Sequence, residues 1–298
     1  MNTPEKFRWG ILATGGIAKI QTADLQLDKS RVTAVGSRSL NSAENFARNF
    51  NIPHYYGTYA ELCGSSEVDI IYVASPHAFH CEHALRAIAG GKHVLVEKAF
   101  TLNAEEAEKV FEAARKAGVF VMEAMWTRFL PSMQRLMEII DGGGIGTPRV
   151  LIADHNQYIP WSKAPRVHDP DLGGGALLDL GVYLLSFASR LFGTPESMEI
   201  SGRLNDMGAD EIAAMICDYA HGAQAVLHCA SMIPGSNTAV VAGDEGRIEI
   251  DRIWYNQTSF THYNREGDVC EKYNEKVPGR GMQYQTREVE HCISRGIN

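Results

Sequence analysis

The stretch Gly10-Ile-Leu-Ala-Thr-Gly-Gly-Ile-Ala18 decides the fold, because it joins a strand-like run at 7–13 to a helix-like run at 17–27. A dinucleotide fold needs small residues at such a turn, where the backbone comes close to a pyrophosphate and a helix N-terminus faces it. Aligned on GxGxxG/A, the stretch reads Ala13-x-Gly15-x-x-Ala18, with alanine at the tight-turn glycine. Small residues can also serve packing alone, so the pattern on either side of the turn must support the interpretation.

Strand and helix alternate through the first 124 residues. β-branched and apolar runs predict buried parallel strands at 31–37, 68–74 and 93–97. Helical patterns lie between and after them, at 42–50, 80–89 and 104–116. This alternation predicts an α/β fold with a doubly wound parallel sheet, whose ligands bind beyond the carboxyl ends of the strands.

The pattern changes near residue 125, which predicts a first domain of residues 1–124 and a second of residues 125–298. In the second we expect helices at 129–140 and 176–192. Strands are expected at 149–155, 198–204, 212–219, 223–231, 238–242 and 247–251. Their short links predict an α+β domain with a mostly antiparallel sheet, one face of which stays open. The apolar residues Ile212, Ala214, Ile216, Val226 and Leu227 predict that a second subunit, most simply in a homodimer, covers that face.

The composition is that of an acidic globular chain. Of 298 residues, 45% are hydrophobic and 21% charged, and the formal net charge is −8. Nucleic acids and anionic membranes need basic surface, so we expect neither as a partner. Six cysteines without a CxxC pair predict reduced thiols in a cytoplasmic protein. No run approaches the roughly 20 apolar residues of a membrane span.

The end of the second predicted strand indicates which dinucleotide is bound. Folds that prefer NAD usually carry Asp or Glu there, which binds the ribose 2′-OH. This chain has Gly36-Ser37-Arg38-Ser39 instead. A guanidinium with neighbouring hydroxyls suits a 2′-phosphate, so we expect NADP to be preferred, with NAD as the lesser cofactor. The alternative is an exposed arginine that caps a loop.

Further motifs follow in order along the chain. They are Ser75-Pro76-His77, the block 84–97 that ends in Glu97-Lys98-Ala99, Glu123-Ala-Met-Trp-Thr-Arg-Phe-Leu-Pro131 and Asp169-Pro-Asp-Leu-Gly-Gly-Gly-Ala-Leu-Leu-Asp-Leu-Gly-Val-Tyr183. With the glycine turn, they make the chain resemble the glucose-fructose oxidoreductase/inositol dehydrogenase/MocA (Gfo/Idh/MocA) family from Arg8 to Arg295. The resemblance is nearest to the branch of dimeric dihydrodiol dehydrogenases and NADP-dependent xylose dehydrogenases.

The resemblance implies a nicotinamide-binding Rossmann domain and a second domain with an open-faced sheet. It implies hydride transfer between NADP and a carbinol of an aldose, cyclic sugar or trans-dihydrodiol; the alternative is a non-catalytic, NADP-sensing regulatory protein of the same fold. Lys98 and Glu97 match the reactive end of the cofactor site, although the family's usual Glu-Lys-Pro ends in Ala99 here and His77 stands where Asn is common. Cofactor contacts are expected from Ala13, Thr14, Gly15, Gly16, Ile17, Ser37, Arg38, Ser75, Pro76, His77, His80, Glu97 and Lys98.

The resemblance also assigns the proton donor to Tyr183, in an Asp-x-Gly-x-Tyr helix with Asp179. A free tyrosine has a pKa of about 10, and an ammonium such as that of Lys98 lowers it. Asp179 and Tyr183 are i and i+4 on the predicted helix, and Ser186 and Arg190 extend the same polar stripe. Alternatively, Tyr183 packs between domains, Lys98 is a solvated strand end, and Asp179 is a surface acid, an orienter of Lys98 or a partner of a sugar hydroxyl.

Trp126, Arg128, Arg166 and His168 are the candidates for substrate contact. Trp126 suits an aromatic wall for a ring or a place in the core. His77, His80 and His83 lack the spacing and carboxylates of a metal site, so we expect no metal. Relatives in the resembled family usually continue past the position of Asn298, so we expect this chain to be incomplete or unusually short.

Overall fold

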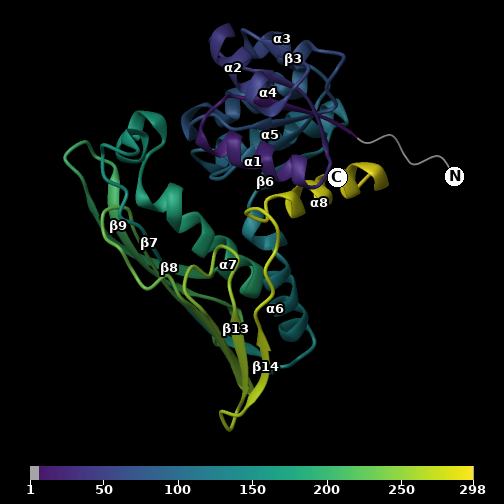
Figure 1. The fold of residues 1–298 in the computed structure, drawn as a ribbon. Coiled ribbons are helices and arrows are strands. Elements are labelled where there is room, and N and C mark those ends of the chain that lie inside the picture. The colour runs from purple at the N-terminus through teal and green to yellow at the C-terminus, as the bar shows by residue number, and fades with distance from the viewer. Residues whose placement is uncertain (1–6, 298) are drawn as a thin grey trace, which may run out of the picture. The chain divides into compact units, whose positions relative to one another are not determined.

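The computed structural model of the protein describes residues 7–297. The chain forms two compact units, Met1–Trp126 with Pro278–Asn298 and Thr127–Val277. The sequence-based boundary lies close to the first of these divisions. The structure differs at 278, where the chain returns to the first unit and adds a helix to it, α8 (Figure 1).

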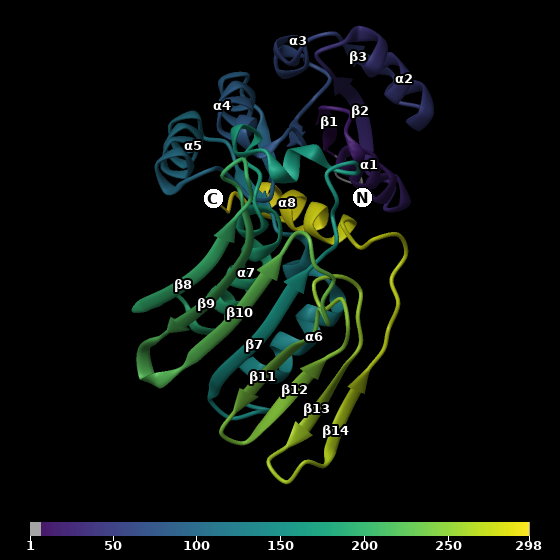
Figure 2. The same ribbon diagram turned by 90° about the vertical axis from the view of Figure 1, so that its left-hand side faces the viewer.

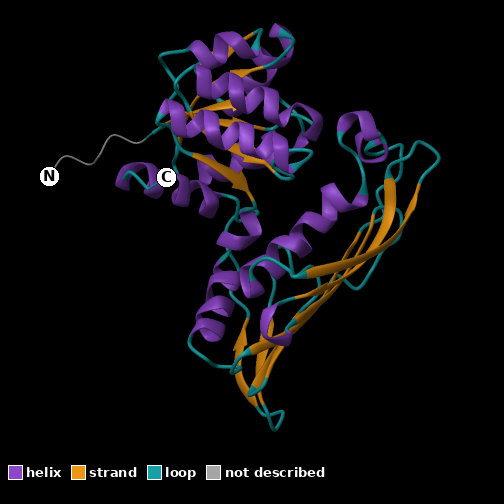
Figure 3. Ribbon diagram, turned by 180° about the vertical axis from the view of Figure 1, so that it is seen from behind, coloured by secondary structure: helices purple, strands orange, loops and turns teal. Residues whose placement is uncertain are grey.

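The first unit is built on a parallel sheet of six strands in the order β3-β2-β1-β4-β5-β6. The strands are β1 (Arg8–Leu12), β2 (Arg31–Gly36), β3 (His54–Tyr56), β4 (Ile70–Val73), β5 (His93–Glu97) and β6 (Val121–Ala124). The helices are α1 (Gly16–Leu27), α2 (Leu40–Phe50), α3 (Tyr59–Gly64), α4 (His80–Ala89), α5 (Ala104–Ala117) and α8 (Gln283–Arg295). Two buried clusters show that α1, α2 and α8 pack on one sheet face and α3, α4 and α5 on the other (Figure 3). The predicted doubly wound Rossmann sheet is therefore confirmed.

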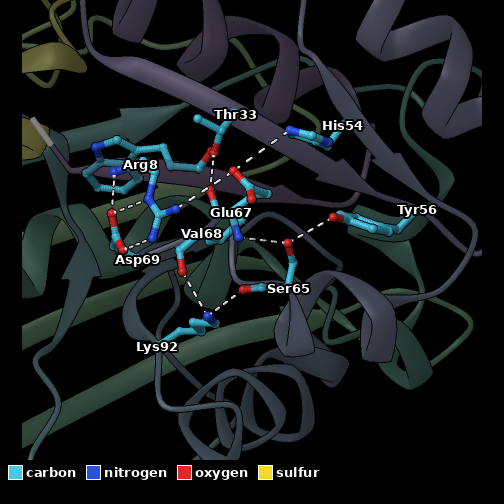
Figure 4. A network of polar contacts seen from close by, with 10 residues as sticks. Arg8, Thr33, His54, Tyr56, Ser65, Glu67, Val68, Asp69 and Lys92 are labelled. Atoms are coloured by element: carbon cyan, nitrogen blue, oxygen red, sulfur yellow. Dashed lines mark hydrogen bonds and ion pairs between the residues drawn. The ribbon is translucent and has the colours of Figure 1, made fainter.

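An ionic network fastens the start of β1 to the turn before its neighbour β4 (Figure 4). The backbone N and Nε of Arg8 donate to Asp69 Oδ2 at 2.9 and 3.0 Å, and Nη2 donates to Oδ1 at 2.7 Å. Lys92 Nζ donates to the carbonyls of Ser65 and Val68 at 2.6 and 2.8 Å. The side-chain hydrogen bonds from Arg8 hold the pKa of Asp69 below its usual value, against the opposing effect of burial.

We expect Asp69→Asn to lower the free energy of unfolding at pH 7 by about 1–2 kcal/mol, because it breaks charge-assisted hydrogen bonds. The side chains of Arg8 and Asp69 are 30% and 32% exposed, and solvent screening keeps the effect in this modest range. A carboxyl whose pKa is depressed on folding stabilises the protein above the unfolded pKa, near 4, and this contribution is lost as pH falls through the folded pKa. The free energies of unfolding of the parent protein and of Asp69→Asn, measured in urea, should therefore differ at pH 7 and converge in acid.

Glu44→Gln is the matched control, because it breaks the exposed Arg48–Glu44 pair on α2. Its expected cost is below about 0.5 kcal/mol. Equal costs for the two substitutions would contradict the role given to Asp69.

The chain re-enters the first unit through the carboxylate of Asp24 on α1. Asp24 accepts hydrogen bonds from the backbone N of Arg280, at 3.1 and 3.0 Å, and of Met282, at 2.9 Å. Directly before Arg280, Gly279 has φ +66, and a Cβ there would lie 2.2 Å from Asp24 Oδ1, so only glycine fits. Trp9 Nε1 also donates to Glu290 Oε1 at 2.8 Å. These contacts dock α8 on α1 and β1.

The second unit has a mixed, mostly antiparallel sheet in the order β14-β13-β12-β11-β7-β10-β9-β8, in which β7 and β10 are parallel. Its strands are β7 (Pro148–Asn156), β8 (Ser197–Leu204), β9 (Asp210–Asp218), β10 (Gln224–Ala230), β11 (Ala239–Gly243), β12 (Gly246–Ile250), β13 (Phe260–Asn264) and β14 (Val269–Tyr273). The helices α6 (Pro131–Asp141) and α7 (Val182–Phe192) lie behind this sheet in Figure 2. The predicted class of this domain is confirmed.

The other face of this sheet lacks helices of its own unit (Figure 2). Neighbouring strands place Ile216, Val226 and Ile152 in one row of that face, with exposed fractions of 42%, 39% and 54%. Leu227 was predicted to share this face, but it is buried, because successive side chains of a strand point to opposite faces. The open face thus carries a short apolar row.

The helix predicted over 176–192 begins with a π-helical turn at Leu177–Gly181, and α7 follows it. The longer helical stretch Pro170–Phe192 is long and apolar enough to cross a membrane by length and composition alone, contrary to the expectation that no run approaches a membrane span. Within its apolar window 56% is buried inside the protein, and α7 packs on β7 and β10. We assign the stretch to the core of the second unit.

Candidate active site

The glycine turn lies between β1 and α1, as the sequence predicts. Ala13 takes the tight-turn position with φ +84, a left-handed conformation that costs an L-residue about 1–2 kcal/mol. Gly15 is the N-cap of α1, and a Cβ on Gly15 or Gly16 would meet nothing within 4 Å. The first turn of α1 carries no acidic residue. The space beside Gly15 and Gly16 is therefore open, and the N-terminus of a helix attracts a phosphate group.

A cavity of about 590 Å³ lies at the carboxyl ends of β2, β3 and β4 in the first unit. Arg38 lines it, as do Ser75 and Pro76. Burial raises the pKa of Tyr59, another lining residue, and the charge and hydrogen bond of Arg38 partly oppose this rise. Ser37 is buried beside the cavity, with its N bonded to Tyr56 O at 3.1 Å. Two further lining residues, His83 and Arg86, were not among the predicted cofactor contacts.

His80 was expected under the cofactor as the first residue of its helix, and it starts α4. Its ring is buried, with Nδ1 2.8 Å from Ala99 O and Nε2 2.8 Å from Ser75 O. Burial lowers the pKa of His80, and the two carbonyls oppose this effect. His80 therefore braces the chain after β4 against the chain after β5, while His77 packs edge-on against its ring at 5.4 Å.

Glu97 and Lys98 stand at the end of β5. Glu97 is buried and accepts a hydrogen bond from the hydroxyl of Tyr72. Burial raises the pKa of Glu97 to about 7, and the Lys98 ammonium acts in the opposite direction. Lys98 itself is half-buried, and its peptide bond to Ala99 is cis. A buried carboxyl thus lies directly before the lysine that the family pattern places at the reactive end.

Asp179 and Tyr183 lie in the second unit, on the π turn and the first turn of α7. Both are buried. Arg166 Nη2 donates to Asp179 Oδ1 at 3.1 Å, so Asp179 is not a surface acid. One predicted substrate contact thereby pairs with one predicted catalytic residue. Lys98 and Tyr183 belong to different units.

Three residues around Tyr183 were not predicted. The His155 ring meets the Tyr183 ring edge-on at 5.1 Å and stacks on Tyr255 at 3.6 Å. Gln157 Nε2 lies 2.9 Å from His155 Nε2 and donates to the Tyr255 hydroxyl at 3.3 Å. The signal for His155 was its place at the carboxyl end of a predicted strand, whereas Tyr255 stands in a loop without a motif.

The other predicted polar contacts have structural partners. Trp126 is buried, with the Arg280 guanidinium 5.1 Å from its ring centroid, which favours the core alternative. Arg128 donates to Ser186 Oγ at 2.7 Å, and Arg190 pairs with Asp141 at 2.8 Å. The two residues that extend the polar stripe beyond Tyr183, Ser186 and Arg190, are thus each paired with a residue of another segment. His168 Nε2 lies 2.7 Å from Ile159 O, beside a second cavity of about 340 Å³.

Within residues 7–297, no group of three or more His, Cys, Asp or Glu side chains is placed to hold a metal ion. The ionisable side chains of the candidate site are therefore those named in the preceding paragraphs.

Comparisons with known proteins agree with this geometry. The family model "Oxidoreductase family, NAD-binding Rossmann fold" matches residues 7–125, and the "GFO/IDH/MocA C-terminal domain" model matches residues 133–249. The trans-1,2-dihydrobenzene-1,2-diol dehydrogenase of Mus musculus is 36% identical over 97% of this chain and 89% of its own. The human enzyme of that name is 32% identical over the same shares.

Two solved structures share the whole architecture. An aldose-aldose oxidoreductase from Caulobacter crescentus, complexed with glycerol, is 25% identical with a TM-score of 0.88, and the match covers 98% of this chain and 90% of that one. A 3-ketoreductase from Actinomadura kijaniata, in complex with NADP and TDP-benzene, is 26% identical with a TM-score of 0.84, over 98% and 91%. With both units matched in sequence and in structure, this chain belongs to the Gfo/Idh/MocA oxidoreductase family.

Proposed function

We propose that the protein is an NADP-dependent dehydrogenase that acts on a carbinol of an aldose, cyclic sugar or trans-dihydrodiol. The observation that carries this proposal is the buried carboxylate of Asp179, which accepts a hydrogen bond from the part-exposed Arg166 one turn before the buried Tyr183. Burying such polar groups is costly, and clusters of this kind are typical of sites that perform chemistry. The relatives named above act on diols, aldoses or keto groups, which gives the substrate class.

The residues of the first unit fit NADP. The open N-terminus of α1, at Gly15, Gly16 and Ile17, would hold the pyrophosphate, and Ala13 and Thr14 would shape the turn beneath it. Arg38 lines a cavity large enough for the adenosine end and would bind the 2′-phosphate. Ser75, Pro76 and His77 would border the cofactor where β4 ends. When bound, NADP supplies or accepts the hydride.

The chain's own residues must handle the hydroxyl proton. Tyr183 would donate or accept this proton at its phenolic oxygen, and Lys98 would lower the pKa of that phenol and polarise the substrate oxygen. Asp179, held by Arg166, would orient Lys98 or bind a second hydroxyl of the substrate. Arg128 and His168 would act at most through the segments that they fasten.

The test is cofactor reduction with a panel of aldoses, cyclic polyols and trans-diols, with NADP binding titrated in parallel. Turnover on at least one carbinol, coupled to NADP, supports the enzyme. Tight NADP binding without turnover on any member of the panel would instead support a non-catalytic sensor of the same fold.

We also propose a homodimer formed through the open sheet face of the second unit. The row of Ile152, Ile216 and Val226 supports it, since a stable interface buries about 800 Å² per partner around an apolar centre. Light scattering at micromolar concentration should give a dimer, and Ile216→Glu should give a monomer. Ile200→Glu is the control, because Ile200 is 57% exposed but points to the opposite face of the same sheet. A monomeric parent protein would contradict the proposal.

We further propose a cytoplasmic location. All six cysteines are free in the structure, and such thiols are typical of a reducing compartment. Fractionation of cells that produce the protein tests this assignment.

A further inference from the structure

The π turn at Leu177–Gly181 carries Asp179 and leads directly into Tyr183. Single π turns inside helices are rare and are often found at functional sites. Such a turn replaces the regular i→i−4 hydrogen bonds with i→i−5 bonds, such as that from Val182 N to Leu177 O, and contacts from outside the turn add to these in keeping its shape. The groups that hold this turn therefore help to set where both side chains lie.

Contacts from the sheet hold the π turn at both ends. At its start, Leu177 N donates to Asp210 Oδ2 at 2.6 Å. Near its end, His155 Nδ1 lies 3.2 Å from Leu180 O. The next residue, Gly181, rests against β10, where a Cβ would come within 3.1 Å of Cys229 Sγ. The sheet thus fixes the turn through backbone atoms of its first residue and of its last two.

The hydrogen bonds of His155 define its tautomer. A carbonyl oxygen only accepts, so the contact with Leu180 O requires the hydrogen on Nδ1. Nε2 is then an acceptor, and the amide N–H of Gln157 points at it from 2.9 Å. The second amide hydrogen of Gln157 is directed at the Tyr255 hydroxyl. Gln157 therefore holds the imidazole in the neutral Nδ1–H form that the π turn needs.

The same imidazole also touches the phenol ring of Tyr183. His155 is 1% exposed, and its ring lies between Tyr255, at 3.6 Å and 23°, and Tyr183, at 5.1 Å and 75°. We propose that His155 is a positioning residue for Tyr183, acting on the phenol through the edge-on ring contact and on the start of α7 through the carbonyl of Leu180. This inference rests on the proposed function for its catalytic consequence, whereas its structural part stands alone.

The first test compares three variants of buried histidines. His155→Phe keeps a ring between the two tyrosines but removes the donor to Leu180 O, and we expect kcat to fall about 10- to 100-fold, the size of a small misplacement of a catalytic group. The affinity for NADP should stay within about twofold, because the residues proposed to bind it belong to the first unit. His155→Asn restores an N–H at the position of Nδ1 and should recover most of the loss.

His262→Phe is the matched control. His262 lies on β13 of the same unit and is also buried. Its Nε2 lies 2.9 Å from the backbone carbonyl oxygen of Gly144. The His262→Phe substitution should leave kcat unchanged. If His155→Phe keeps the parent kcat, or if His262→Phe loses as much, the positioning role is overturned.

The second test needs no turnover. Hydrogen–deuterium exchange of the amides of 177–183 should quicken in His155→Phe, return towards the parent rate in His155→Asn and stay unchanged in His262→Phe. Unchanged exchange in His155→Phe overturns the inference. If exchange quickens as expected but Tyr183→Phe retains the parent kcat, the hold on the π turn is supported, and the proton-donor role in the proposed function fails instead.

Discussion

Tyr183→Phe is expected to lower kcat by about 10²–10⁴-fold, the usual contribution of general acid–base catalysis, with little change in the affinity for NADP. The substitution removes the phenolic proton but keeps the ring, so the contacts with His155 and Tyr255 remain. Steady-state kinetics on the best substrate of the panel, with a separate NADP titration, measures both quantities.

Lys98→Met should cause a loss of similar size. The double variant should lose far less than the product of the two single losses, because the proposed mechanism has both groups act on one proton. An ammonium lowers the pKa of a nearby phenol, so its removal raises that pKa, and the basic limb of the rate profile should move to higher pH in Lys98→Met.

Tyr219→Phe is the control for Tyr183. Tyr219 is buried in the same unit after β9, and burial raises its pKa to about 12. It should retain the parent kcat. If Tyr183→Phe also turns over normally, another group carries the proton and Tyr183 serves packing.

Arg38→Ala should weaken NADP binding by about 10- to 100-fold, because a lost hydrogen bond to a charged group costs about 1.5–3 kcal/mol. NAD lacks the 2′-phosphate, so its affinity should hardly change. Fluorescence titration with both dinucleotides gives the ratio. Arg48→Ala on α2 removes an exposed arginine that pairs with Glu44 outside the cavity, and it should affect neither. Equal losses of affinity for NADP and NAD in Arg38→Ala would contradict the assignment of Arg38 to the 2′-phosphate.

The sequence predicted the elements that have a strong local period. β1, β2, β4 and β5, with α1, α2, α4 and α5, follow from apolar runs and turn residues that lie close together in the chain, whereas the short helix α3 (Tyr59–Gly64) was missed. The strands β3 and β6 were missed, because β3 has only three residues and the four residues of β6 include the charged Glu123. The helix α8 was missed for another reason. Part of the face that it buries is polar, with Gln285 Nε2 donating to Gln21 Oε1 at 3.0 Å.

The candidate site was predicted where a motif marks it and missed where only the fold creates it. Tyr183 and Asp179 stand in one motif, but their π turn has no sequence signature, because the apolar pattern of Leu177 and Leu180 fits an α-helix equally well. Sequence alone cannot show that a histidine on one strand meets a carbonyl 25 residues later in the chain. The sequence also could not show that Arg166 would pair with Asp179, since an arginine in a loop has many partners within reach.

The docking of α8 on α1 through Asp24 has a consequence for how the chain is made. A ribosome synthesises residues through Trp126 first, but Val289 and Cys292, which complete the core beside Trp9 and Leu25, follow only after the whole second unit. At about 5–20 residues per second, the second unit takes roughly 8–30 s to synthesise. Throughout that interval α1 and α2 cover this sheet face, but the part of it that α8 covers lies open. Co-translational folding of this protein therefore begins with a nucleotide-binding unit whose core is completed only after α8 has been synthesised.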